Sequence, residues 1–204
     1  MRNINKYFVE GLLIVFSVLF ALFIDKMYDD YLLSQKREIA LQSVIKELQK
    51  NQSLLQDWNL RHTVIQDRIS AILENKQPEL KAALEQERFL QLGVLTNNQS
   101  LADSMLSVTA WESAKSTGIV AEFDFETTRK LTDAYALQQM ITERTFAQII
   151  DYYFDSDAHD MANIDRVLLQ FELRFKELTS QEWMLARLYD DALTHLEAID
   201  KTKN

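Results

Sequence analysis

Apolar side chains recur at alternating steps of four and three residues through the N-terminal half of this chain. The stripe comprises Val44, Leu48, Asn51, Leu55, Trp58, His62, Ile65, Ile69 and Ile72. Such heptad spacing predicts a long α-helix with one narrow side that packs against other helices. We expect this helix to end near Asn75. We interpret Asn51 and His62, the polar members of the stripe, as buried residues that set the packing register rather than as ligands.

A second stripe lies near the C-terminus and predicts the last helix of the fold. It comprises Ile164, Leu168, Phe171, Phe175, Leu178, Glu182, Leu185, Tyr189, Ala192, Leu196 and Ile199. Glu182 is its only charged member, and residues 179–182 (TSQE) match a capping box. A new helix start at this point and one continuous helix both agree with the pattern.

A third stripe lies between the first two and is half polar. It comprises Thr127, Leu131, Ala134, Gln138, Ile141, Thr145, Gln148 and Tyr152, and Asp124 stands where it can cap the start of this helix. Because the stripe is half polar, we expect this helix to be less deeply buried than the others.

Shorter helices are predicted in the remaining part of the chain. Pro78 and Gly93 stand where a helix would begin and end, so we expect a short helix over about residues 79–92. Residues 96–99 (TNNQ) predict a loop. Ser100 resembles an N-cap and predicts a helix that runs through Trp111 and stops at Gly118.

The composition favours helices throughout. Only three glycines and one proline occur in 204 residues, which is too few for a sheet-rich fold with many tight turns. Strong helix formers are abundant instead. The sequence predicts an all-α fold, in which an N-terminal transmembrane helix is followed by a bundle of long helices with coiled-coil-like stripes.

The transmembrane helix is predicted from residues 7–24, an apolar run that Glu10 alone interrupts with a charge. As a helix this run spans roughly 27 Å, close to the hydrocarbon thickness of a bilayer. A cleaved signal peptide has a shorter core and a small-residue cleavage site, which residues 21–26 (ALFIDK) do not offer. We therefore divide the chain into a membrane anchor, residues 1–25, and a helical bundle domain, residues 26–204.

The charges beside the predicted span favour a bundle outside the cytoplasm. Arg2 and Lys6 precede the span, whereas Lys26 follows it among Asp25, Asp29 and Asp30. Because basic flanks tend to stay inside, we expect a short cytoplasmic tail and a periplasmic bundle.

Four residues of the predicted span are candidates for contact with a partner in the membrane. A carboxylate within a span is costly, which makes Glu10 a functional candidate, although placement at the membrane interface would also explain it. Gly11 flanks it, and Ser17 and Ala21 form a small-x-x-x-small pair on which another helix can pack.

Several other classes of function lack support in the sequence. The net charge of −9 argues against nucleic acid, and the absence of cysteine excludes disulfides and thiolate metal sites. No phosphate loop, nucleophile elbow or His-Glu-x-x-His motif occurs. Residues 155–160 (DSDAHD) lack the glycine of a calcium loop and are interpreted as caps and turns. We therefore assign no catalytic, cofactor-binding or metal-binding residue and expect no enzyme.

Three segments carry a resemblance to a known family. They are Glu10 with the apolar run that follows it to Asp25, the segment WESAKSTG at residues 111–118, and the pair Tyr152-Tyr153. With these segments the chain resembles a family of uncharacterised bacterial single-pass membrane proteins that carry a helical domain of unknown function. The resemblance implies a protein of the bacterial envelope and no particular reaction.

The expected function is that of a membrane-anchored helical scaffold in the bacterial inner membrane. It would assemble with itself, as a homo-oligomer, or with another membrane protein. The alternative is an extracytoplasmic helical domain that senses a small molecule. Such sensors usually signal through a second span or a cytoplasmic module, and this sequence shows neither.

Overall fold

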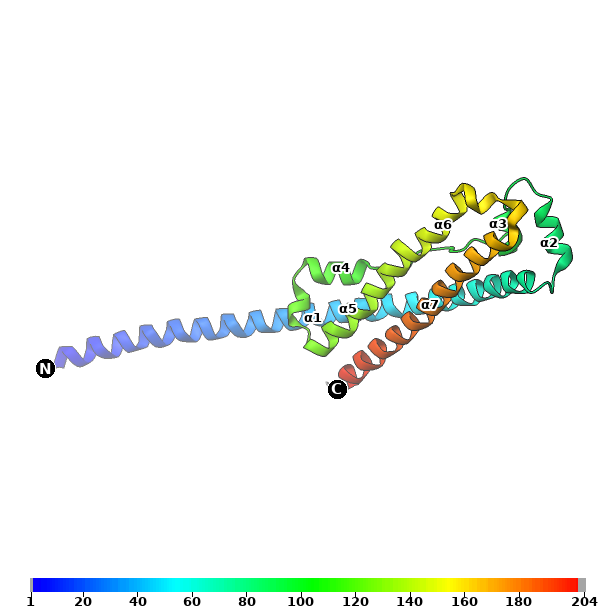
Figure 1. The fold of residues 1–204 in the computed structure, drawn as a ribbon. Helices are drawn as coiled ribbons and strands as arrows, with labels where there is room; N and C mark the ends of the chain where they lie inside the picture. The colour runs from blue at the N-terminus through cyan, green and yellow to red at the C-terminus, as the bar shows by residue number, and fades with distance from the viewer. Residues whose placement is uncertain (1, 202–204) are drawn as a thin grey trace.

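A computed structural model describes the backbone of residues 2–201 and the side chains of residues 9–199. Within this range the chain is all-helical and contains no strand, which confirms the all-α part of the predicted fold. Helix α1 (Arg2–Leu73) runs without a break and extends far beyond the other helices at its N-terminal end (Figure 1). Helix α7 (Ile164–Lys201) packs back along the far half of α1.

The stripe predicted on α1 forms one wall of the core. Its side chains are all buried, none of them with more than 2% of its surface exposed, and they are Val44, Leu48, Asn51, Leu55, Trp58, His62, Ile65, Ile69 and Ile72. The helix ends just before Asn75, which adopts a left-handed conformation with φ of 56°. Both the stripe and the helix end are therefore confirmed.

Helix α7 is continuous, so of the two possibilities at residues 179–182 the structure shows the unbroken helix. Glu182 lies in the middle of the helix and is fully buried. The other members of its stripe between Ile164 and Leu196 are buried as well. A polar partner on α1, described below, allows the charged residue to remain in the stripe.

The third wall consists of α5 (Phe125–Met140), the π-helical turn η2 (Ile141–Thr145) and α6 (Phe146–Phe154). Thr127, Gln138 and Thr145 each have no more than 3% of their surface exposed. The expectation that this helix is less deeply buried than the others is therefore wrong. The π turn adds a residue to the helical repeat. Beyond it the buried position is therefore Ile149, while the predicted Gln148 is exposed.

Short elements close the ends of the bundle. They are α2 (Pro78–Glu85), α3 (Leu92–Thr96), α4 (Thr109–Ser116), η1 (Ile119–Glu122), η3 (Ser156–His159) and η4 (Met161–Asn163). Pro78 begins α2 and Gly118, with φ of 75°, follows α4, both as predicted. Asn97 and Asn98 have positive φ, in agreement with the predicted loop.

Two of these boundaries differ from the prediction. Helix α2 ends at Glu85 because Leu90 is buried in the core, and Gly93 lies within α3 instead of ending a helix. Ser100 starts no helix, because its hydroxyl donates to the carbonyl of Ala102 and the chain runs without a helix to α4. Leu101, like Leu106 further along, is buried, so tertiary packing holds this non-helical segment against the core.

Among the residues whose side chains the structure describes, no helix has a stretch both long and apolar enough to cross a membrane. The structure therefore does not support the predicted transmembrane helix. The first two residues of the predicted span, Tyr7 and Phe8, lie outside the described side chains.

Candidate functional site

The N-terminal part of α1, residues 9–24, exposes apolar side chains in every direction. Its large apolar residues have 50 to 65% of their surface exposed, and they are Val9, Leu12, Leu13, Ile14, Val15, Phe16, Val18, Leu19, Phe20, Leu22, Phe23 and Ile24. This segment is helical but stands apart from the bundle (Figure 1). A helix that is apolar all round normally lies in an apolar environment.

The four residues predicted to contact a partner lie on two different sides of this helical segment. Glu10, Ser17 and Ala21 share one face, because spacings of seven and four residues return to the same side of a helix. Gly11 points about 100° away, and a Cβ atom there would meet nothing within 4 Å. The Ser17 hydroxyl donates to the carbonyl of Leu13 at 2.8 Å, so it is satisfied within its own helix.

The charged residue of one stripe pairs with the histidine of the other. His62 Nδ1 lies 2.6 Å from Glu182 Oε1, and His62 Nε2 lies 2.9 Å from the carbonyl oxygen of Leu101. Both side chains are fully buried. The rings of Trp58, Phe146 and Phe175 surround the imidazole. The pair is enclosed and has no route to a substrate, so it joins α1 to α7 and to the segment before α4.

Sequence reasoning singled out both residues as interruptions but did not pair them. A signal for the pairing was present, because His62 and Glu182 are the only imidazole and the only carboxylate in the two stripes. Buried charges need partners, and antiparallel packing of the two stripes brings their middles together. The interpretation of His62 as a packing residue agrees with this geometry.

Glu47 forms a second polar cluster and positions α4. Its carboxylate accepts hydrogen bonds from the Tyr135 hydroxyl at 2.7 Å, the Ser107 hydroxyl at 2.5 Å and the Ala110 N–H at 2.9 Å. A carboxylate at this place complements the positive N-terminal end of α4. The Trp111 ring stacks on Tyr135 with ring centres 5.4 Å apart. Burial and then the carboxylate of Glu47 raise the pKa of Tyr135.

Asn51 extends this cluster across the bundle. Its side-chain amide accepts from the Ser107 N–H at 2.8 Å and donates to the Ser107 carbonyl at 2.7 Å. The amide thus makes the same pair of hydrogen bonds to Ser107 that a neighbouring β-strand would make. Gln138 of α5 also donates to that carbonyl and accepts from the Tyr189 hydroxyl of α7. Burial raises the pKa of Tyr189. Asn51 and Gln138 thus hold the backbone at Ser107, and Tyr189 in turn holds Gln138. Sequence reasoning found the register role of Asn51 but not Glu47, which lies beside the stripe and breaks no pattern.

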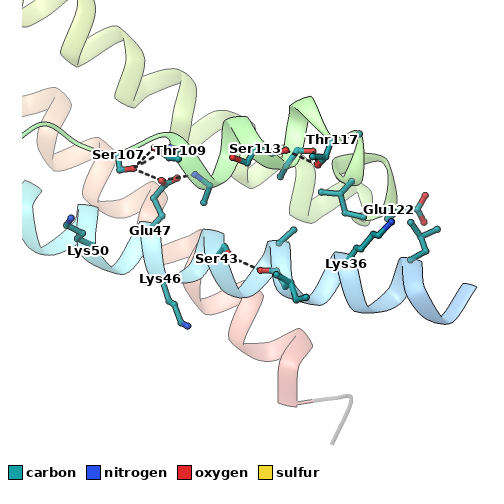
Figure 2. Close-up of a pocket in the computed structure, with 17 residues that line it drawn as sticks. Lys36, Ser43, Lys46, Glu47, Lys50, Ser107, Thr109, Ser113, Thr117 and Glu122 are labelled. Atoms are coloured by element: carbon teal, nitrogen blue, oxygen red, sulfur yellow. Dashed lines mark hydrogen bonds between the residues drawn. The ribbon is translucent and has the colours of Figure 1, made fainter. Parts of the chain in front are cut away.

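A groove of about 900 Å³ lies between α1 and the segment formed by α4 and η1 (Figure 2). Short side chains form most of its walls, including Ala40, Ser43, Ala110, Ser113 and Ala114. Leu33 and Ile119 add apolar surface, and Lys36, Lys46 and Lys50 line it from α1. Sequence reasoning missed this groove, because small residues on segments far apart in the sequence form no recognisable pattern.

The remaining histidines and the acidic segment have local roles. Asp155 caps η3 by accepting from the Asp157 N–H, and Asp160 pairs with Arg166 at 2.9 Å, so this segment forms caps and turns as predicted. His159 Nδ1 accepts from the Leu90 N–H. The structure keeps the three histidines in separate places, since His195 contacts Thr127.

Comparison with known protein families, with curated proteins and with solved structures found no match for this chain. The resemblance to bacterial single-pass membrane proteins therefore stays a prediction. Any functional conclusion rests on the geometry above.

Proposed function

We propose that this chain is a membrane-anchored helical scaffold without enzymatic activity, which assembles with itself or with another membrane protein. The observation that carries the proposal is the apolar segment of α1, exposed on all sides and joined without a break to a packed bundle. The proposed anchor is residues 1–25, of which residues 7–24 form the proposed membrane span.

Free energies of transfer support this proposal. Burying one large apolar side chain is favourable by about 1.5–3 kcal/mol. Transfer of all the exposed apolar side chains of residues 9–24 from water to an apolar environment is therefore favourable by tens of kcal/mol. A partner helix would cover one stripe of such a segment, whereas lipid covers every side. A bilayer is thus the environment that best fits its exposure.

The bundle supplies the rigid part of the proposed scaffold. The two polar clusters hold α1, α5, α7 and the segment before α4 in one register. Fully hydrogen-bonded buried clusters of this kind favour one packing arrangement. The proposed location is the bacterial inner membrane with the bundle in the periplasm, supported by the basic tail before the anchor and the acidic residues after it.

Flotation of the full chain with phosphatidylcholine vesicles tests the anchor. We expect the parent protein to float and Leu13→Lys/Phe20→Lys to stay at the bottom of the gradient, because charges in the bilayer are costly. The matched control is Leu60→Lys/Val64→Lys, which changes exposed apolar residues of α1 within the bundle. A parent protein that is monomeric in detergent-free buffer and does not float would refute the proposal.

Labelling of single cysteines in intact cells tests the orientation. The chain has no native cysteine, so one at Glu87, at the far end of the bundle, is unique. We expect a membrane-impermeant thiol reagent to modify Glu87→Cys before lysis and Asn3→Cys only after it. The reverse order would place the bundle in the cytoplasm.

A further inference from the structure

The groove between α1 and α4 has the dimensions of a ligand site. Its volume of about 900 Å³ lies within the range of small-molecule pockets, roughly 300–1,000 Å³. It follows α1 from Leu33 to Lys50, a length of roughly 25 Å at 1.5 Å per residue. The short side chains of Ala40, Ala110 and Ala114 leave this space open. The groove therefore fits an elongated apolar ligand.

Three of the hydroxyl groups in the groove donate to the protein itself. Ser43 donates to the carbonyl of Ile39, and Thr117 donates to the carbonyl of Ser113, each at 2.8 Å. Ser107 donates to Glu47. The protons of these three hydroxyls are therefore not free for a ligand, whereas the charged side chains can attract an anionic group at longer range.

Positive charge gathers at one end of the groove, where Lys46 and Lys50 lie. Within the part of the chain that the structure describes, no ion pair involves Lys46 or Lys50. Glu47 lies nearby, but its carboxylate already accepts hydrogen bonds from Ser107, Tyr135 and Ala110. This local excess of positive charge occurs in a chain whose net charge is −9.

The two ends of the groove differ. Figure 2 shows Lys36 reaching toward Glu122 at one end, while Lys50 lies at the other end near Glu47. Lys46 points away from α4 but lies one helical turn from Lys50, and its flexible four-carbon stem allows it to turn. An anion is therefore favoured at the Lys50 end.

We infer that this groove binds an amphipathic anion, an alkyl chain that ends in a carboxylate or a phosphate. The anionic group lies at Lys50 with Lys46 beside it, and the chain runs along Ala40 and Ala110 toward Leu33. The inference goes beyond the proposed scaffold function, since a scaffold needs no such ligand.

Protection of a single cysteine in the groove tests the inference. The full chain carrying Ser113→Cys, placed in phosphatidylcholine nanodiscs, is alkylated with and without hexadecanoate or hexadecyl phosphate. We expect both anions to slow alkylation at least fivefold and uncharged hexadecanol to leave it unchanged. The matched control is Ser116→Cys, on the same helix but outside the groove lining, where no ligand should change the rate. A chain that does not insert elutes apart from the discs before any ligand is added, so failure of the anchor is seen separately.

Lysine variants on the Ser113→Cys background test the role of charge. We expect Lys50→Gln to raise the half-protecting anion concentration at least threefold, and Lys46→Gln/Lys50→Gln at least fivefold. Lys36→Gln, beside Glu122, and Lys176→Gln on α7 should stay within twofold of the parent. Equal effects of all four variants would overturn the placement of the anion.

Two nanodisc compositions distinguish the sources of the anion. Protection in phosphatidylglycerol discs without added ligand identifies a bilayer lipid. Protection by hexadecanoate in phosphatidylcholine discs alone identifies a free fatty-acid-like molecule. Absence of protection by any anion, equal protection by hexadecanol, or equal protection of Ser116→Cys would overturn the inference.

Discussion

A buried carboxylate is tolerated only where hydrogen-bond donors surround it, and Glu182 has such donors on α1. His62 approaches one carboxylate oxygen, and the Asn59 amide lies 3.3 Å from the other. Because both members of the His62–Glu182 pair are fully buried, each depends on the other for its hydrogen bonding. The strength of this dependence can be measured by removing one or both.

We predict that His62→Leu and Glu182→Leu each destabilise the bundle by about 3–5 kcal/mol, because each leaves its partner buried and unpaired. The double variant should lose clearly less unfolding free energy than the two single variants lose together, since it leaves neither partner unpaired. Chemical unfolding of the parent, both single variants and the double variant measures the coupling. Additive losses would show that the two side chains do not stabilise each other.

Asp124 is a second residue whose charge matters locally. Its carboxylate accepts from the Thr127 N–H at 2.9 Å and from the Thr127 hydroxyl, and so caps α5. Burial raises its pKa, but the hydrogen bonds from Thr127 and the nearby His195 outweigh burial, so the pKa is lowered overall.

We predict that the cap of α5 weakens in acid. Since the folded-state pKa of Asp124 is below its ordinary value, its contribution is complete above that value and is lost as the pH falls through the folded-state pKa. Asp124→Ala should cost about 1 kcal/mol near neutral pH. Unfolding measured from pH 6 to pH 3 should show the difference from Asp124→Ala shrinking. A difference that stays constant over this pH range would contradict the assignment to Asp124.

At the scale of helices, the stripes on α1 and α7 could be predicted from spacing alone, because a buried helix side repeats regularly. The third stripe was predicted as well, but its side chains are buried more deeply than its polar composition suggested. Thr127, Gln138 and Thr145 are polar yet buried, because His195, Tyr189 and Gln181 provide their hydrogen bonds. Partners from distant parts of the chain are not visible in a local pattern.

We predict that the stripe on α1 determines the stability of the bundle. Leu55→Ala and Ile69→Ala should each cost about 2–5 kcal/mol, because both side chains are fully buried. Gln56→Ala and Asp67→Ala, which lie off the stripe and are exposed, should change stability by no more than about 0.5 kcal/mol. Denaturant titrations compare the two sets, and equal effects would mean that another side of α1 faces the core.

At the scale of the whole molecule, the proposed assembly depends on the face that carries Glu10, Ser17 and Ala21. Hydrogen bonds between membrane helices are worth about 0.6 kcal/mol on average. We predict that Glu10→Leu weakens recovery of the oligomer or partner from mild detergent, whereas Glu10→Gln retains part of it. Phe16→Leu, on another side of the helix, is the control. Unchanged assembly of both Glu10 variants would leave that residue with an interfacial role only.

The groove between α1 and α4 could not be predicted from the sequence. Its walls come from residues 33–50 and residues 107–122, which the loop and short helices bring together only in the folded chain. Glu47 holds α4 in place through the Ala110 N–H, but an acidic residue beside a stripe has no distinctive spacing. The predicted contact residues Glu10, Ser17 and Ala21, by contrast, lie within one helix, where their spacing alone places them on the same side.

The unbroken course of α1 gives the molecule the mechanics of a lever. At 1.5 Å per residue its 72 residues extend roughly 108 Å. Rotation of such a rod by about 10° around one end displaces the other end by roughly 19 Å, by simple trigonometry on that length. Small changes in inclination at the N-terminal end therefore become large movements of α2 and α3, which lie at the distal end beside the last turns of α1.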